Sequence, residues 1–265
     1  MAGGPAIHAR ISRPCAAIDA AMPTPPLPMA ELLFAYSVFA SVPRPRTLHG
    51  SPLRDVDSIL RDITSAPLRR LTHDQLSEFA TSAISTVGES EDYRHFLPRI
   101  LELAVLGRPD MGFEAGVIAG KLEMAGWRSW PRKEREAIEV VFRAAFRRAI
   151  EMDTDEEREA SEWLLGLCRL GLDPSPSLAA WRASPTVNAA LQLAVFVDET
   201  KVMDGLVADG TWRDVDEAAR RTVATWAHSQ ETWAQLLAAV DAASRQGPAS
   251  GEGAWLIELA VAKLP

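Results

Sequence analysis

The chain has 265 residues, of which 47% are hydrophobic and 24% are charged, as is usual for a globular protein. No apolar run approaches the roughly 18 residues that a membrane-spanning helix needs, and the two cysteines are too few for a disulfide scaffold. The net charge of −8 is concentrated after residue 150, which opposes wrapping of a nucleic acid along the whole chain.

The first 28 residues are rich in proline and small residues and show little periodicity. This composition predicts a disordered tail over residues 1–28, followed by one helical domain over residues 29–265. Arg10 and Arg13 are not followed by the apolar segment of a signal peptide. We therefore expect a cytoplasmic protein in a reducing compartment.

Helix signals begin directly after the tail. The spacing of apolar residues predicts a helix over about 29–42, which Pro43 ends, and a second over about 53–63. Sustained alternation of β-branched residues is missing, and no Asn-Gly or Asp-Gly turn lies between such runs. The pattern therefore predicts an all-helical chain.

Thr72 is expected to begin the third helix. Its hydroxyl can accept a hydrogen bond from a first-turn N–H, and Gln75 completes a capping box. Apolar residues recur at helical spacing as far as Val87, and Gly88 is the expected left-handed stop. Ser90 then begins a fourth helix, in which Pro98 predicts a kink or two abutting helices.

Later helices are predicted over about 113–126 and 131–151, and a further one begins at the acidic residues 153–157 and ends at Gly171. More follow over about 176–183, 185–200, 213–227, 230–245 and 252–263. The short loops predict about eleven helices in stacked antiparallel hairpins, as an irregular array of the HEAT or armadillo kind. The tryptophans from Trp163 onward are interpreted as core anchors.

The fourth helix carries the first candidate site. Asp92, His95, Arg99 and Glu102 lie within about 80° of one another on a helical wheel. Such a row is one arrangement for catalysis or ligand binding. The interpretation we favour is a solvated face opposite the apolar stripe from Tyr93 to Ile100, because alternating charges form weak pairs along exposed helices.

A second candidate site follows at Lys121, Trp127, Arg128 and Trp130. Two tryptophans beside an arginine are typical of a stacking platform or an interface hot spot. Tryptophans at a helix junction more often hold the two helices together, and we favour that interpretation. The next helix alternates basic residues with Glu134, Glu136 and Glu139, and this alternation favours a solvated face.

The motifs of common cofactor sites are missing. The acidic run at residues 153–157 has Arg158 where a calcium loop needs glycine. The chain contains no GxxxxGK[ST], HExxH or GxSxG motif, and its five histidines are scattered. The sequence therefore predicts no metal and no cofactor.

The segment that begins at Leu71-Thr72 resembles an uncharacterised bacterial all-helical, HEAT-like family over about residues 30–150. The resemblance rests on Tyr36 with Pro43-Arg44-Pro45, on Leu71-Thr72, on the run from Asp92 to Leu103, and on Lys121-Leu122 through Trp127 to Trp130-Pro131. It implies a fold and no activity. Members often carry cysteines after the Pro-Arg-Pro turn, where this chain has His49-Gly50-Ser51-Pro52.

These patterns favour a non-enzymatic helical scaffold whose partner is another protein, because helical arrays present extended surfaces. A nucleic-acid-binding or base-modifying HEAT-like protein is the alternative, supported by the basic stretch near Arg128 and opposed by the overall acidity. An enzyme that uses the row from Asp92 to Glu102 ranks lowest. The sequence does not predict the oligomeric state.

Overall fold

The structure, a computed structural model, describes residues 24–107, 111–153, 160–199, 206, 210–245, 257–258 and 261–262. These residues form eleven α-helices, and their only β pairing is two isolated bridges at Val87. The predicted all-helical class is thus confirmed for the described part of the chain. Most of the predicted tail, residues 154–157 of the predicted helix start at 153–157, and most of the 252–263 helix lie outside the described residues.

Short 3-10 turns, η1 (Phe39–Ser41), η2 (Leu68–Arg70) and η3 (Trp127–Ser129), accompany the α-helices. None of the described helices is both long and apolar enough to cross a membrane. The α-helices are α1 (Met29–Val38), α2 (Val56–Thr64), α3 (His73–Ser82), α4 (Ser90–Leu106), α5 (Ala115–Met124), α6 (Arg132–Ala149), α7 (Ala160–Arg169), α8 (Ser175–Ala183), α9 (Val187–Glu199), α10 (Glu217–Ala227) and α11 (Gln230–Arg245).

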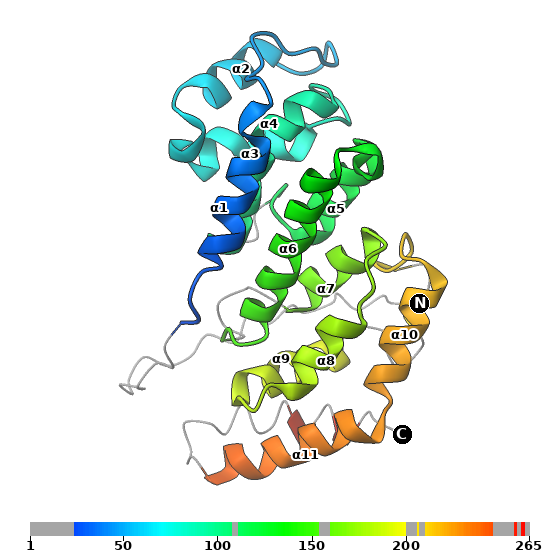
Figure 1. Ribbon diagram of the computed structural model, residues 1–265. Coiled ribbons are helices and arrows are strands. Elements are labelled where there is room, and N and C mark those ends of the chain that lie inside the picture. The colour runs from blue at the N-terminus through cyan, green and yellow to red at the C-terminus, as the bar shows by residue number, and fades with distance from the viewer. Residues whose placement is uncertain are drawn as a thin grey trace, which may run out of the picture.

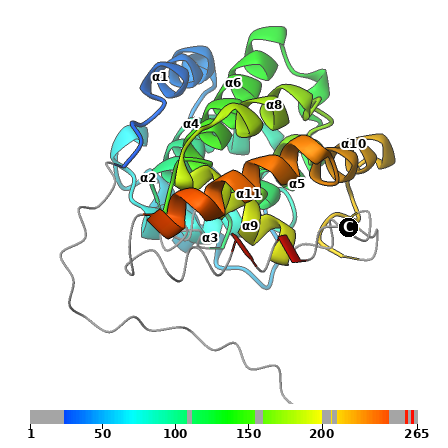
Figure 2. The ribbon, with the colours of Figure 1, turned by 90° about the horizontal axis from the view of Figure 1, so that it is seen from below.

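From α5 onward, the helices pack in two rows. The odd-numbered helices contact one another in the order α5, α7, α9 and α11, and the even-numbered ones in the order α6, α8 and α10. The rows lead from α5 and α6 down to α11 at one end of the molecule (Figure 1). Seen from below, α11 crosses α8 and α9, which it contacts (Figure 2).

The first helix does not follow that order. α1 packs against both α4 and α6, although α6 begins about a hundred residues later in the chain. In a solenoid each repeat contacts only its neighbours. The contacts of α1 therefore leave the regular array unconfirmed for the whole chain.

The tryptophans form much of the core in the second half, as predicted. Trp181 is fully buried between α8 and its neighbours, with Phe146 and Phe196 at ring-centroid distances of 5.5 and 5.7 Å. Trp226 of α10 lies 5.4 Å from Trp181. These contacts join helices of both rows. Trp255 lies outside the described residues.

The third helix ends earlier than its apolar spacing predicts. It stops at Ser82, and Ile84 takes the left-handed conformation with φ 66°. Gly88 is also left-handed, at φ 67°, but it precedes Glu89, the N-cap of α4. The expected glycine conformation is therefore present, whereas its place at the end of the third helix is wrong, because the turn over 83–87 forms its own hydrogen bonds.

Pro98 lies inside one helix. α4 runs unbroken from Ser90 to Leu106, and Pro98 itself is buried. The alternative of two separate helices is therefore wrong. Neighbours surround α4, since α1, α3, η1 and η2 all pack against it.

The capping box at the start of α3 gives a direct test of local stability. The Thr72 hydroxyl accepts a hydrogen bond from the Gln75 N–H, and the Gln75 side chain accepts one from the Thr72 N–H. Thr72→Ala is expected to lower the free energy of unfolding by about 1 kcal/mol, because it removes the N-cap acceptor. Urea denaturation measures this loss. Thr72→Ser keeps the hydroxyl, so an equal loss in that variant would contradict the capping role.

Candidate functional site

The predicted row on α4 begins with two half-buried side chains. Asp92 accepts a hydrogen bond from the Glu89 N–H at 2.8 Å and so caps α4. The His95 ring lies edge-on to Phe96, and its Nδ1 donates to the Val42 carbonyl at 2.9 Å, since a carbonyl can only accept. Burial lowers the pKa of His95 and raises that of Asp92. Both side chains therefore serve the packing of α4.

The other half of the row joins three segments. The Arg99 guanidinium donates from Nε to the Leu71 carbonyl at 2.8 Å and from one terminal nitrogen to Glu102 at 2.6 Å. Tyr36 of α1 donates its hydroxyl to the same Glu102 carboxylate at 2.5 Å. The side chains of Arg99 and Glu102 are only 13% and 19% exposed. The interpretation of a solvated face is therefore wrong here, because α1 and the residues around Leu71 cover this side of α4.

Lys121 is buried in α5. Its Nζ donates to the Ala83 carbonyl at 2.8 Å and to the Ser85 hydroxyl at 2.9 Å. Burial lowers the pKa of Lys121. The ammonium group lies at the C-terminal end of α3, where the helix dipole favours a positive charge. Lys121 thus fixes the turn after α3 and lies away from bulk solvent.

The two tryptophans hold a helix junction together. Trp127 and Trp130 are 5% and 7% exposed, and Trp127 donates to Glu123 at 2.7 Å. Neither offers an open face for stacking, so the structural interpretation is confirmed. Arg128 differs, since its side chain is 58% exposed and donates to Glu123 at 2.9 Å and to the Leu170 carbonyl at 3.2 Å.

The eight predicted residues fall into separate places. The structure brings Arg99 and Glu102 into contact, and it joins Trp127 and Arg128 through their shared acceptor, Glu123. Arg128 is the exposed member of the eight, whereas the other seven are half-buried or buried.

The sequence missed a buried ion pair between α4 and α6. Arg94 donates to both carboxylate oxygens of Glu134, at 3.1 and 2.6 Å, and its guanidinium lies 5.1 Å from the centre of the Trp130 ring. The Glu134 side chain is 8% exposed. Its assignment to a solvated face is therefore wrong. Because charges alternate evenly along α6, the sequence pattern did not distinguish the buried Glu134 from the other carboxylates of this helix.

Three adjoining hollows, which we name the arginine row, lie over the second half of the molecule. The first hollow has a volume of about 440 Å³ and lies between the start of α6 and the end of α7. The middle hollow, of about 870 Å³, shares Arg128, Gly171 and Leu172 with it. Ser175 donates two hydrogen bonds to Asp173 on its wall and lowers the pKa of that carboxyl.

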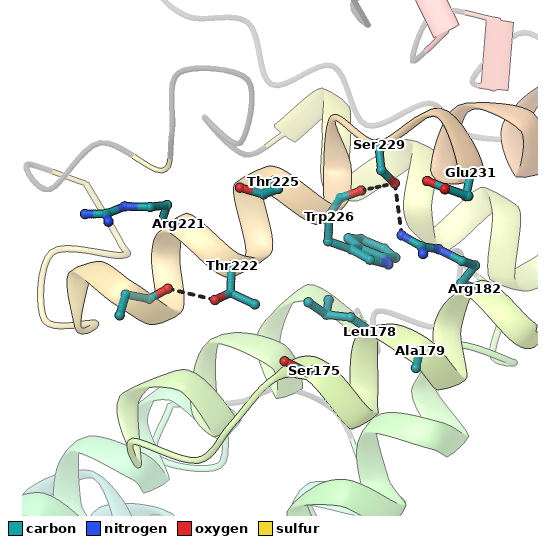
Figure 3. Close-up of a pocket in the computed structure, with 11 residues that line it drawn as sticks. Ser175, Leu178, Ala179, Arg182, Arg221, Thr222, Thr225, Trp226, Ser229 and Glu231 are labelled. Atoms are coloured by element: carbon teal, nitrogen blue, oxygen red, sulfur yellow. Dashed lines mark hydrogen bonds between the residues drawn. The ribbon is translucent and has the colours of Figure 1, made fainter.

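The last hollow of the row lies between α8 and α10. Its volume is about 640 Å³, and it shares Ala218 and Thr222 with the middle hollow. Figure 3 shows Trp226 of α10 above Leu178 of α8, with Arg182 beside them. Arg182 donates to Ser229 at 2.9 Å, just beyond the end of α10. The three hollows together therefore extend over α6, α7, α8 and α10.

Positive and negative side chains line the arginine row in equal number. The positive residues are all arginines: Arg128, Arg132, Arg135, Arg169, Arg182, Arg213 and Arg221. The carboxylates belong to Glu123, Glu136, Glu139, Asp173, Asp214, Asp216 and Glu231. Of these residues, the sequence singled out only Arg128 as a candidate. The residues of the middle and last hollows beyond Glu123 and Arg128 lie about 40 or more residues after Arg128, so no local pattern joined them to it.

The lowered pKa of His95 predicts how stability depends on pH. The folded state binds this proton less readily than the unfolded state, whose histidine titrates near pH 6.5. The free energy of unfolding should therefore fall as the pH decreases through that value. His95→Asn keeps a donor for Val42 without a titrating ring, so its urea denaturation should show a weaker decrease between about pH 7 and pH 5. Equal slopes would contradict this assignment.

Cys168 lies behind the middle hollow, is 1% exposed, and burial raises its pKa to about 12. Because the thiolate is the reactive form, we expect no labelling of the folded protein at pH 8. A Cys15→Ser variant isolates this thiol, and iodoacetamide labelling followed by mass spectrometry measures the reaction. Labelling should appear only in urea. Rapid modification without urea would contradict the burial.

Comparison of this chain with protein-family models, with curated proteins and with solved structures finds no match. The resemblance to a bacterial helical family therefore stays a prediction.

Proposed function

We propose that the protein is a non-enzymatic helical scaffold that binds another protein through the arginine row. The observation that carries the proposal is the lining of the row, with equal numbers of arginines and carboxylates around apolar patches. Interfaces between proteins are enriched in arginine and depleted in lysine. Charges of both signs also match a polypeptide, which presents both.

The same lining weighs against a nucleic acid. A phosphate backbone is held by an excess of basic side chains, whose binding releases counterions. Along the arginine row the carboxylates equal the arginines in number, so there is no such excess. The nucleic-acid-binding alternative also needs aromatic rings on which bases can stack, and Trp127 and Trp130 are buried.

Photo-crosslinking in the native cells tests the proposal. A photoreactive phenylalanine analogue replaces Arg135, an exposed residue of the row, and in a matched variant replaces Arg61, an exposed residue of α2. The two positions belong to different parts of the fold, because Arg135 is in α6 and Arg61 is in α2, which lies apart from α6, α8 and α10 (Figure 1). We expect a discrete protein adduct from position 135 and none from position 61.

An adduct of equal yield from both positions, or none from either, would overturn the proposal. Recovery of nucleic acid from position 135 would favour the alternative function. A gel-shift assay at low ionic strength would then show salt-sensitive binding, because phosphate contacts weaken with salt.

A further inference from the structure

The last hollow is built as a trough between two helices. Leu178 and Ala179 of α8 line one side, and Trp226 of α10 lines the other. Figure 3 shows Trp226 lying over Leu178, while Arg182, Ser229 and Glu231 gather at one end. The trough thus combines an apolar middle with an end that carries the Arg182 guanidinium and, at its rim, the Glu231 carboxylate.

Arg182 has no carboxylate within salt-bridge distance among the described residues. Its terminal nitrogen donates to the hydroxyls of Ser229 at 2.9 Å and Thr232 at 3.5 Å. Two other half-buried arginines differ, since Arg94 and Arg99 each hold a carboxylate at 2.6 Å. A half-buried guanidinium gains most from an ionised acceptor, because such hydrogen bonds are about twice as strong as neutral ones.

Two further donors at this end of the trough lack an acceptor. Trp226 is 8% exposed, and its indole Nε1 has no hydrogen-bond partner in the described structure. The Nε of Arg182 is also enclosed and without a partner. The guanidinium lies 6.0 Å from the Trp226 ring. Unmatched N–H groups of this kind are rare in folded proteins.

We propose that the last hollow binds an acidic peptide segment of the partner protein, with a carboxylate on the Arg182 guanidinium. An apolar side chain next to that carboxylate then lies between Leu178 and Trp226. This inference rests on the proposed function, because it names which part of the arginine row holds the partner and which chemistry it recognises.

A carboxylate fits this end better than a phosphate does. One planar guanidinium matches the two oxygens of a carboxylate. Glu231 stands at the rim of the trough, where hydrogen bonds from its own backbone N–H and from Ser229 lower its pKa most and the charge of Arg182 lowers it further. Its negative charge opposes a doubly charged phosphate more strongly than a singly charged carboxylate.

A phage-displayed library of short random peptides, selected on the full-length protein, tests the inference. We expect the selected peptides to carry Asp or Glu beside an apolar residue. Synthetic copies should bind the Arg182→Met variant at least about tenfold more weakly in calorimetry, because the peptide carboxylate loses its charged partner. The matched control is Arg61→Met, which removes an exposed arginine of α2 outside the arginine row and should leave peptide binding unchanged.

A second variant keeps the test valid if Arg182→Met does not fold. Ala179→Glu places a carboxylate on an exposed position of α8, three residues before Arg182, where it competes with the peptide. Circular dichroism checks that both variants keep their helices, and both should lose peptide binding.

The outcomes separate this inference from the proposed function. Acidic peptides that bind Arg182→Met and Ala179→Glu as tightly as the parent protein would overturn the inference. Selection of basic peptides, or of none, would overturn it as well. The crosslinked adduct at position 135 would remain in each case, because Arg135 lines the first hollow.

Discussion

Glu134→Gln is expected to lower the free energy of unfolding by about 3 kcal/mol, because it breaks an ion pair that is largely enclosed. Arg94 holds both oxygens of this carboxylate, and the two side chains are 18% and 8% exposed. The neutral amide leaves the guanidinium without its counter-charge between α4 and α6. Urea denaturation with a fitted midpoint and slope measures the loss.

The matched control is Glu136→Gln on the same helix. Glu136 is exposed, so its replacement should change the free energy of unfolding by less than about 0.5 kcal/mol. The double variant Arg94→Met with Glu134→Gln should recover part of the loss, since a neutral pair leaves no buried charge. Equal effects at positions 134 and 136 would show that the ion pair does not stabilise the fold.

The ion pair of Arg94 and Glu134 also shows which features a sequence pattern predicts and which it does not. The helix around Glu134 could be predicted, because Ile138, Val141 and Phe142 recur at helical spacing, and all three are buried. The burial of Glu134 could not, because it depends on Arg94, forty residues earlier. A helical wheel gives the side of a helix and not the neighbour that covers it.

The prediction of a solvated row on α4 was wrong for the same reason. Its four polar residues share one side of the helix, as predicted, but that side is covered by Tyr36, Val42 and Leu71 from earlier segments. The prediction assumed that the polar side of a helix is exposed to solvent. α4 instead has neighbours on both its apolar and its polar side, so its charges are satisfied within the chain.

Sequence signals predicted a feature correctly where the residues that form it lie within one turn of each other. The capping box of Thr72 and Gln75 formed as predicted, because both partners lie within one turn. Gly171, predicted as a helix stop, is left-handed just after α7. The last hollow depends instead on Arg182, Trp226 and Ser229, which α8 and α10 bring together. Trp226 was correctly predicted as buried, but nothing in the sequence placed Arg182 beside it.

Two glycines inside helices are expected to respond to alanine in opposite directions. A Cβ on Gly166 of α7 would lie 2.8 Å from the Phe142 ring and 3.0 Å from the Ala115 carbonyl oxygen. Because that oxygen belongs to the backbone of α5, the two helices must separate. Gly166→Ala should therefore lower the free energy of unfolding by about 2 kcal/mol, since overpacking outweighs the gain in helix propensity.

Gly120 of α5 is the control, because a Cβ there would meet no atom within 4 Å. Gly120→Ala should raise the free energy of unfolding by about 1 kcal/mol, since alanine loses less backbone freedom in a helix than glycine does. Urea denaturation of the two variants gives both signs in one experiment. Stabilisation by both would mean that α5 and α7 do not approach each other closely at Gly166. That result would contradict the close packing of α5 against α7, which is the first contact in the odd-numbered row of helices.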